Sequence, residues 1–378
     1  MIEFGFGCMR LPQTDKDDES SVDFELFKKM VDKYMESGFN YFDTAFGYHE
    51  GVSEVAVRKA VVERYPRESF IIADKLPIYM MPKSEDEFQP AFDTQLERLG
   101  VDYIDYYMLH NASGWTANAF ENLDAFKFVR EKKAEGKIKY LGISCHDDAE
   151  FLEKLLPEHP EIEFVQLQVN YLDWENDSIQ SRKCVEVCRK YNKDIIVMEP
   201  VRGGTLSNLP EDIAKILTDY DSSKSLASWA LRFCRGIECV KTVLSGMSDL
   251  EQVEDNLSSM TNFEPLNDYE LQLLDQVVEK MNSKLAVPCT YCKYCVPYCP
   301  INIPIPKYFE FTNTEKLVNQ EGFSVQIQGY LNMTNRGAPK ASECLECGAC
   351  AKICPQQLDI PGYLKSIVVE TLEKDVPW

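Results

Sequence analysis

The sequence lacks three features that would place it in a membrane, outside the cell or on nucleic acid. It has no run of about 18 apolar residues, the length that crosses a bilayer as a helix. Its first residues, Met1 to Gly5, carry neither the basic region nor the apolar core of a secretion signal. Positive charge is scarce, because 40 Lys and Arg face 62 Asp and Glu, and no basic stripe offsets the net charge of −22. We therefore expect a soluble cytoplasmic protein with no membrane and no nucleic-acid partner.

Cysteine, by contrast, is abundant near the C-terminus, where one motif occurs twice. Each copy reads C-x2-C-x2-C-x3-C-P, the spacing that holds cubane iron-sulfur clusters. In this run three thiolates surround one cluster, and the fourth, which precedes the proline, binds the other cluster. The motifs therefore predict two [4Fe-4S] clusters. The predicted ligands are Cys289, Cys292, Cys295 and Cys354 for one cluster, and Cys344, Cys347, Cys350 and Cys299 for the second.

Zinc is the alternative for these cysteines, but zinc sites use two pairs of cysteines rather than two quartets. The pattern resembles a two-cluster bacterial-type ferredoxin, and the resemblance implies an electron-transfer domain. The segment between the motifs is long for a compact ferredoxin, and 308–319 and 325–333 have helical patterns. Gly348 lets the second loop approach the sulfurs closely, whereas the first loop contains no glycine. We expect a small, mostly helical ferredoxin-like iron-sulfur domain at 281–378.

The first 280 residues alternate short apolar runs with helical patterns. Strand then helix, repeated eight times, favours the α/β class and a closed (β/α)8 TIM barrel over residues 1–280. An open doubly wound sheet would need a glycine-rich turn after its first strand, and Phe6-Gly7-Cys8-Met9 does not supply one. The predicted strands are 2–7, 39–43, 70–75, 104–110, 139–144, 164–169, 195–199 and 240–246, and the predicted helices are 24–37, 53–64, 84–99, 118–135, 148–156, 178–191, 223–235 and 249–259.

Polar residues stand where these strands end, which is where a barrel carries its chemistry. Asp43, Lys75 and His110 end the second, third and fourth predicted strands, and Tyr48 follows Asp43 closely. Each residue alone has an ordinary structural explanation, such as a cap or a rim position. Lys75 is the exception, because it ends a strongly apolar strand and inward-facing lysines are rare without a partner. Together, in barrel order, the four residues favour a catalytic site.

At this point the sequence resembles the aldo-keto reductase superfamily. The matching segments are Phe42-Asp43-Thr44-Ala45 with Tyr48, Gly51-Val52-Ser53-Glu54, Ala73-Asp74-Lys75, Leu109-His110 and Gly142-Ile143-Ser144. The resemblance implies that Tyr48 donates a proton to the substrate oxygen and that the Lys75 ammonium makes this transfer easier. Asp43 holds Lys75 in its charged form, and His110 orients the carbonyl or shares proton delivery.

The same resemblance implies contacts to a nicotinamide cofactor, NADP or NAD. Three residues depart from the family pattern. Met198 stands where many members have an aromatic residue that stacks on the nicotinamide, and Gly246 and Gln252 replace basic residues that often bind the 2′-phosphate of NADPH. The implied cofactor contacts are Ser144 and Gln166 for the carboxamide, Glu199, Arg202, Gly203 and Gly204 for the pyrophosphate, and Ser245, Gly246 and Asn256 for the adenosine side.

Two loops with aromatic residues are candidates for the rim of a pocket for a modest aldehyde or ketone. They are 111–118, around Trp115, and 171–174, which ends at Trp174. Packing of the loops explains the same aromatic residues equally well.

Both halves together predict an enzyme, an NAD(P)H-linked oxidoreductase that reduces a small carbonyl or oxidises the alcohol. Nicotinamide moves two electrons as a hydride, whereas each cluster passes one, so a coupling step is required. Two clusters can store an electron pair, or a flavin can stand between them, although no flavin fingerprint is legible. The leading hypothesis has the clusters exchange electrons with an external ferredoxin or flavodoxin. Structural clusters are a simpler variant, and the alternative function is a nucleotide-binding redox sensor without carbonyl turnover.

Overall fold

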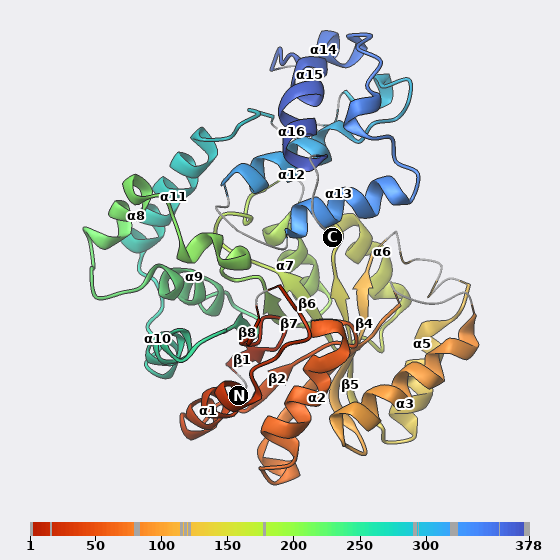
Figure 1. The fold of residues 1–378 in the computed structure, drawn as a ribbon, viewed down its shortest axis with the longest axis vertical. Coiled ribbons are helices and arrows are strands. Elements are labelled where there is room, and N and C mark those ends of the chain that lie inside the picture. Colours follow the sequence, from red (N-terminus) through yellow and green to blue (C-terminus); the bar gives the residue numbers. More distant parts are fainter. Residues whose placement is uncertain are drawn as a thin grey trace. The chain divides into compact units, whose positions relative to one another are not determined.

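The computed structural model describes residues 3–15, 17–78, 84–113, 116, 119, 122–176, 179–289, 293, 295–317, 324–354 and 356–373. The chain forms two compact units (Figure 1). Unit 1 comprises Met1–Glu175, Ile179–Asn208 and Asp221–Glu270, and unit 2 comprises Asn176–Ser178, Leu209–Tyr220 and Leu271–Trp378. Unit 2 thus takes two short segments from within the barrel's part of the chain and begins its main segment at Leu271. The expected domain boundary at residue 280 stays a prediction.

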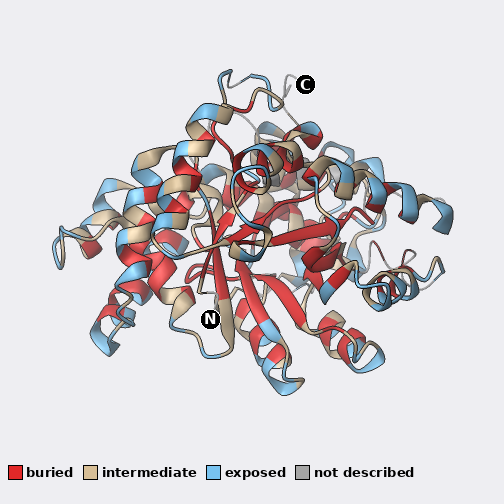
Figure 2. Cartoon of the chain, turned by 90° about the horizontal axis from the view of Figure 1, so that it is seen from below, coloured by how far each residue is buried: buried red, intermediate tan, exposed pale blue. Residues whose placement is uncertain are grey.

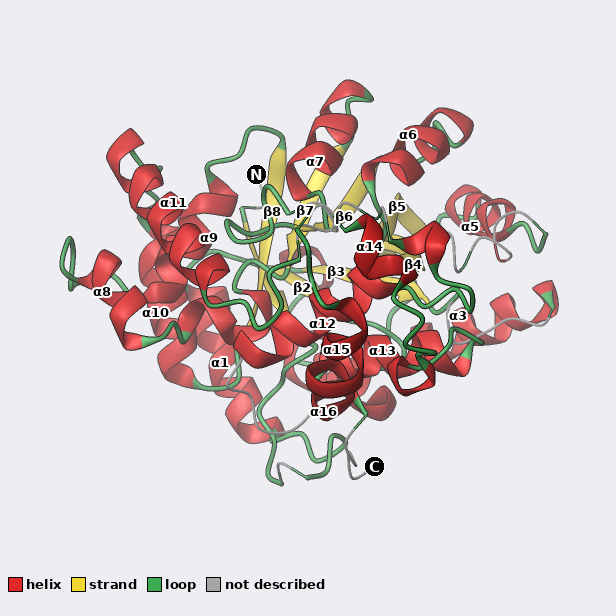
Figure 3. Ribbon diagram, turned by 90° about the horizontal axis from the view of Figure 1, so that it is seen from above, coloured by secondary structure: helices red, strands yellow, loops and turns green. Residues whose placement is uncertain are grey.

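Unit 1 is a closed barrel of eight parallel strands, as predicted. Each strand pairs with the next, and β8 pairs with β1 to close the sheet, with Phe4 opposite Val243. Figure 3 shows the strands in yellow among the red helices, and Figure 2 shows that the strands are largely buried. The strands are β1 Phe4–Gly7, β2 Tyr41–Asp43, β3 Ile71–Leu76, β4 Ile104–Ala112, β5 Ile138–Cys145, β6 Phe164–Gln168, β7 Asp194–Met198 and β8 Val240–Gly246.

Helices follow the strands of the barrel, and capping side chains determine where several of them begin. The carboxylates of Asp23, Asp148 and Asp249 accept backbone N–H groups at the starts of α1, α6 and α10. Helices α3, α5, α7 and α9 each begin three or more residues later than the pattern predicts. Before α5 and α7, Asp124 and Gln180 take left-handed backbone conformations (φ 49° and 57°). The helices are α1 Phe24–Glu36, α2 Val52–Val57, α3 Phe88–Leu99, α5 Ala125–Ala134, α6 Ala149–Glu158, α7 Ser181–Lys190, α9 Leu226–Arg235 and α10 Leu250–Thr261.

Unit 2 is mostly helical, as predicted. Its core combines apolar residues that flank the cysteine motifs with residues of its helices, among them Ile303, Tyr308, Phe309, Tyr330 and Leu364. None of the helices in the described part of the chain is long and apolar enough to cross a membrane. Its helices are α8 Glu211–Thr218, α12 Ile305–Leu317, α13 Val325–Asn335, α14 Ala349–Ile353, α15 Ile360–Tyr363 and α16 Val369–Leu372, while α11 Asp268–Ser283 begins in unit 1.

Candidate active site and cluster cavities

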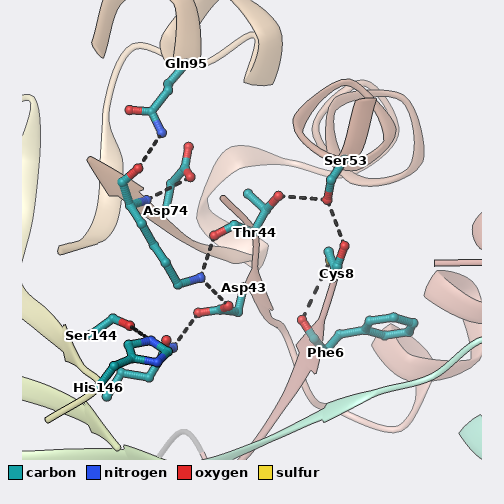
Figure 4. Close-up of polar contacts among 11 residues, drawn as sticks. Phe6, Cys8, Asp43, Thr44, Ser53, Asp74, Gln95, Ser144 and His146 are labelled. Carbon is teal, nitrogen blue, oxygen red and sulfur yellow. Dashed lines mark hydrogen bonds and ion pairs between the residues drawn. The ribbon is translucent and has the colours of Figure 1, made fainter. Parts of the chain in front are cut away.

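A buried ion pair lies at the carboxyl ends of β2 and β3. The ammonium of Lys75 donates to Oδ1 of Asp43 at 2.5 Å and to the carbonyl oxygen of Thr44 at 2.7 Å (Figure 4). The other carboxylate oxygen, Oδ2 of Asp43, accepts a hydrogen bond from Nε2 of Gln166 at 2.8 Å. Lys75, Asp43 and Gln166 are all buried. Both oxygens of Asp43 are therefore bonded, which fixes the carboxylate beside the lysine.

Lys75 keeps its charge despite this burial. Burial on its own disfavours the charged ammonium, but Asp43 and then Tyr48 more than compensate and raise the pKa of Lys75 above its ordinary value. A buried charge is tolerated in a protein when it is paired and hydrogen-bonded, as this one is. The site thus contains a permanent cation at neutral pH.

Tyr48 and His110 complete the group at this end of the barrel. The Lys75 ammonium lies 5.0 Å from the centroid of the Tyr48 ring, and the Tyr48 and His110 rings lie edge to face with centroids 6.0 Å apart. Tyr48 is only half-buried, so part of its ring is accessible. His49 and Glu50 after it take left-handed conformations (φ 51° and 54°), which are strained for residues other than glycine. The four residues predicted from strand ends therefore lie together, held by a strained turn.

His110 is neutral at physiological pH. Burial, followed by the positive charge of Lys75 and the influence of His146, lowers the pKa of His110 well below its ordinary value. A neutral imidazole can donate one hydrogen bond and accept another. His110 can therefore bind a carbonyl oxygen without carrying a charge.

This lowered pKa predicts how stability depends on pH. Below about pH 6.5, the ordinary pKa of histidine, the unfolded chain binds a proton at His110, and the folded chain does so only at lower pH. The contribution of His110 to the free energy of unfolding is therefore fully present above about pH 6.5. It is lost as the pH falls below this value, by about 1.4 kcal/mol per pH unit.

Chemical denaturation of wild type and His110→Gln between pH 5 and pH 8 checks this. The free energy of unfolding should fall less on acidification in the variant than in wild type. Val129→Ala, which truncates a buried side chain of the barrel core and removes no titratable group, is the control and should keep the wild-type slope. An unchanged slope in His110→Gln would show that His110 takes up its proton at the same pH in the folded and unfolded chains, and would contradict the lowered pKa.

The residues predicted to bind the nicotinamide carboxamide stand at the same end of the barrel. Ser144 lies near the end of β5, is buried, and pairs through Oγ with Nε2 of His146 at 3.0 Å. Gln166 lies on β6 and contacts Asp43, a partner that the sequence does not predict. Sequence reasoning missed His146 as well. Its position directly after a strand end was the available signal.

The loop predicted to bind a pyrophosphate has an unusual backbone. Four residues of this loop have positive φ values, which lie between 50° and 99°: Glu199, Arg202, Gly203 and Gly204. The Arg202 guanidinium donates through Nε to Oδ2 of the buried Asp173 at 3.0 Å. The same oxygen accepts hydrogen bonds from the side-chain amides of Gln168 and Asn170 at 2.9 and 2.8 Å.

The predicted adenosine side contains two further charged residues that sequence reasoning missed. Ser245 accepts a hydrogen bond from Nδ2 of Asn256 at 3.0 Å, which joins β8 to α10. Arg10 packs against Gly246, since a Cβ added to that glycine would lie 3.4 Å from Cβ of Arg10. The carboxylate of Asp249, the N-cap of α10, accepts hydrogen bonds from the backbone N–H and from the side-chain amide of Gln252. A cation and an anion therefore flank this region.

Of the two predicted rim loops, the structure describes one fully. Trp115 and Asn118 lie outside the described residues. In the second loop Tyr171 is buried, and Trp174 packs edge to face on Phe233 with centroids 5.5 Å apart. Packing thus accounts for these two aromatic residues.

The predicted cluster ligands surround two hollows in unit 2. Cavity A is lined by Cys289, Cys295 and Cys354 together with mostly apolar residues and the polar Lys293 and Gln356. Cys292 lies outside the described residues. Cavity B is lined by Cys299, Cys344, Cys347 and Cys350. Each cavity thus takes its fourth cysteine from the other motif, which is the arrangement that cross-ligation requires. Ligation itself stays a prediction.

The two motifs repeat in their backbone as well as in their cysteines, at a spacing of 55 residues. Lys293 and Gly348 both take left-handed conformations (φ 62° and 68°), and so do Asn302 and Gln357 (φ 60° and 54°). Lys293 therefore takes, without being a glycine, the same left-handed conformation as Gly348. The Ile303 backbone N–H donates to the sulfur of Cys299 at 3.2 Å, a bond that stabilises a thiolate.

The cavities fit a cluster better than a single ion. A zinc ion needs ligands that converge on one point at about 2.3 Å. Among the described residues, no three His, Cys, Asp or Glu side chains converge in this way, although all four cysteines of cavity B are described. Sulfur atoms spread around an apolar hollow suit a polynuclear iron-sulfur cluster.

Comparison with known proteins agrees with both halves of this description. A family model described as "Aldo/keto reductase family" matches residues 3–279, and one described as "4Fe-4S dicluster domain" matches residues 288–358. The uncharacterized oxidoreductase YqkF of Bacillus subtilis is 26% identical over 301 residues, which cover 72% of this chain and 91% of YqkF. The NADH-specific methylglyoxal reductase of Escherichia coli is 28% identical over 187 residues, 45% of this chain and 55% of that protein.

A solved structure shares the barrel. The aldo-keto reductase AKR11C1 from Bacillus halodurans, in its holo form, superposes with a TM-score of 0.58 at 28% identity, over 73% of this chain and 91% of that one. The first family match covers most of the chain and includes every strand of the barrel and the four residues Asp43, Tyr48, Lys75 and His110. The chain therefore belongs to the aldo/keto reductase family of oxidoreductases and carries a C-terminal 4Fe-4S domain.

Proposed function

We propose that the barrel reduces a small aldehyde or ketone with NADH or NADPH, or oxidises the corresponding alcohol. We further propose that unit 2 holds two [4Fe-4S] clusters, which exchange electrons with an external ferredoxin or flavodoxin. The observation that carries the barrel's part is the buried Lys75–Asp43 pair beside an accessible tyrosine ring. Such a pair is costly to bury, and it supports a catalytic function because the lysine acts on the tyrosine.

The roles of the four residues follow from their geometry. Hydride transfer leaves negative charge on the substrate oxygen, and the Tyr48 hydroxyl donates the proton that neutralises it. The Lys75 cation favours the phenolate that Tyr48 becomes, while Asp43 and the Thr44 carbonyl hold the ammonium in place. The neutral His110 ring orients the carbonyl. The nicotinamide, when bound, supplies the hydride.

The choice between NADH and NADPH rests on the charges near α10. A 2′-phosphate needs cationic partners, and the family's usual basic positions are Gly246 and Gln252 here. Asp249 at the start of α10 opposes a phosphate, whereas Arg10 against Gly246 favours one. The related E. coli methylglyoxal reductase is NADH-specific. The ratio of the kcat/KM values for NADPH and NADH, measured in wild type and in Arg10→Gln, tests whether Arg10 or Asp249 dominates. If Arg10 dominates, the ratio should favour NADPH in wild type and fall in the variant.

The arrangement of the two cavities supports two clusters of the ferredoxin type. Two clusters can together hold the electron pair that one hydride carries, and each can pass single electrons to a carrier. The thiolates require a reducing compartment, which fits a cytoplasmic location. Structural clusters, which take no part in turnover, are the simpler variant.

Anaerobic assays of cluster-loaded protein test the proposed function. Purified protein should oxidise NADH or NADPH in the presence of at least one member of a panel of small aldehydes and ketones. Cluster absorbance followed during the same additions shows whether unit 2 exchanges electrons with the barrel. Nucleotide binding without turnover of any carbonyl would favour the alternative, a redox sensor.

A further inference from the structure

His146 is a second imidazole at the catalytic end of the barrel. It directly follows β5, which ends at Cys145, and its side chain is exposed there. Its Nε2 atom lies 3.0 Å from Oγ of Ser144, and Figure 4 shows the two residues near Asp43. The helix after it is capped by Asp148, so His146 is not needed to begin that helix. Its side chain bonds Ser144, a residue expected to touch the cofactor.

The electrostatic surroundings keep this ring neutral. Although His146 is exposed, the neighbouring protein and then the positive charge of Lys75 disfavour the charged ring and lower its pKa. His146 in turn contributes to the lowered pKa of His110. The three groups Lys75, His110 and His146 therefore share one local field, in which only the lysine is charged at pH 7.

A serine hydroxyl needs such a partner if it is to bind a ligand in one orientation. The hydroxyl has one donor and two acceptor positions and rotates about its C–O bond. The bond to His146 uses one of these positions, so the others aim in fixed directions. Either neutral tautomer of the ring has this effect.

We propose that His146 is a positioning residue, which fixes the Ser144 hydroxyl so that it meets the carboxamide of a bound nicotinamide. The inference rests on the proposed nicotinamide function and adds a residue to it. It predicts that His146 affects binding of the nicotinamide end of the cofactor and not of its adenosine end, and that it acts only through Ser144.

Two ligands separate these effects. NAD⁺ carries the carboxamide, whereas ADP-ribose has the same adenosine, pyrophosphate and second ribose without it. Dissociation constants for both are measured anaerobically by calorimetry with cluster-loaded protein. For His146→Ala we expect the Kd of NAD⁺ to rise about 5- to 15-fold, the effect of one lost hydrogen bond, while the Kd of ADP-ribose stays within twofold.

Three further variants sharpen the result. His146→Gln, whose amide can still reach a hydroxyl, should recover part of the affinity for NAD⁺. In a Ser144→Ala background, His146→Ala should cause no additional loss, because the two substitutions remove the same interaction. His159→Ala, which removes a histidine stacked on Phe126, should leave both constants unchanged.

Two outcomes would overturn the proposal. One is an equal loss of affinity for NAD⁺ and ADP-ribose, and the other is a loss from His146→Ala that adds fully to that from Ser144→Ala. In either case wild-type binding of NAD⁺ still supports the proposed function. If wild type prefers NADP⁺, the same comparison is made with NADP⁺ and 2′-phospho-ADP-ribose. If wild type binds neither NAD⁺ nor NADP⁺, the nicotinamide function itself fails, and this inference fails with it.

Discussion

Replacing Tyr48 by phenylalanine is expected to lower kcat for carbonyl reduction by about 10²- to 10⁴-fold, the usual contribution of a general acid. The substitution removes one oxygen atom and keeps the ring that lies over the Lys75 ammonium. The Kd for the nucleotide should therefore stay within about twofold. Because the hydroxyl acts in the transition state, kcat and kcat/KM should fall together.

Tyr41, on the strand that precedes Tyr48 in the chain, offers a matched control variant. The hydroxyl of Tyr41, on β2, is buried and has no hydrogen-bond partner among the described residues. Tyr41→Phe removes the same atom from the same barrel and should leave kcat within about twofold. If Tyr48→Phe retained the wild-type rate, Tyr48 could not be the proton donor, and the role of Lys75 would need another explanation.

Replacing Cys299 by serine is expected to remove the cluster of cavity B, although Cys299 belongs to the first motif. Wild type should carry about eight irons per chain and the variant about four. Cys354→Ser should remove the cluster of cavity A in the same way. Iron analysis and visible absorbance after anaerobic purification measure both effects, and Cys234→Ser, in the core of the barrel, is the control.

Pairs of substitutions test the cross-ligation directly. Cys299→Ser combined with Cys344→Ser should lose no more iron than either alone, since both residues line cavity B. Cys299→Ser combined with Cys289→Ser should lose both clusters, since these residues line different cavities. The opposite pattern would mean that each motif binds its own cluster. Stoichiometric zinc without visible absorbance would refute the clusters altogether.

The features that sequence predicts well are those that depend on local pattern. Eight apolar runs separated by helical segments identify the barrel, because parallel strands buried on both faces need such runs. Polar residues at the ends of those runs locate Asp43, Lys75 and His110 at one end of it, because parallel strands bring their carboxyl ends together. The spacing of the cysteines indicates the clusters because it, too, is a local pattern.

What sequence does not predict depends on contacts between distant residues. Gln166 bonds Asp43 across a separation of 123 residues, and no local pattern encodes that choice. Lys293 occupies a left-handed turn where a glycine is expected, because the repeat of the fold imposes the conformation on it. His146 follows directly after the end of β5, but no sequence pattern indicates its bond to Ser144.

The central claim is that a hydride passes directly to a carbonyl beside Tyr48, and following that hydride tests it most directly. NADH or NADPH carrying deuterium on one face of C4, then on the other, is supplied anaerobically with a reducible aldehyde, and the alcohol is examined by mass spectrometry. The account predicts deuterium on the carbinol carbon with one label and none with the other. Alcohol that contains no deuterium with either label would contradict it, because the electrons would then have reached the substrate by another route and the hydrogen would have come from water.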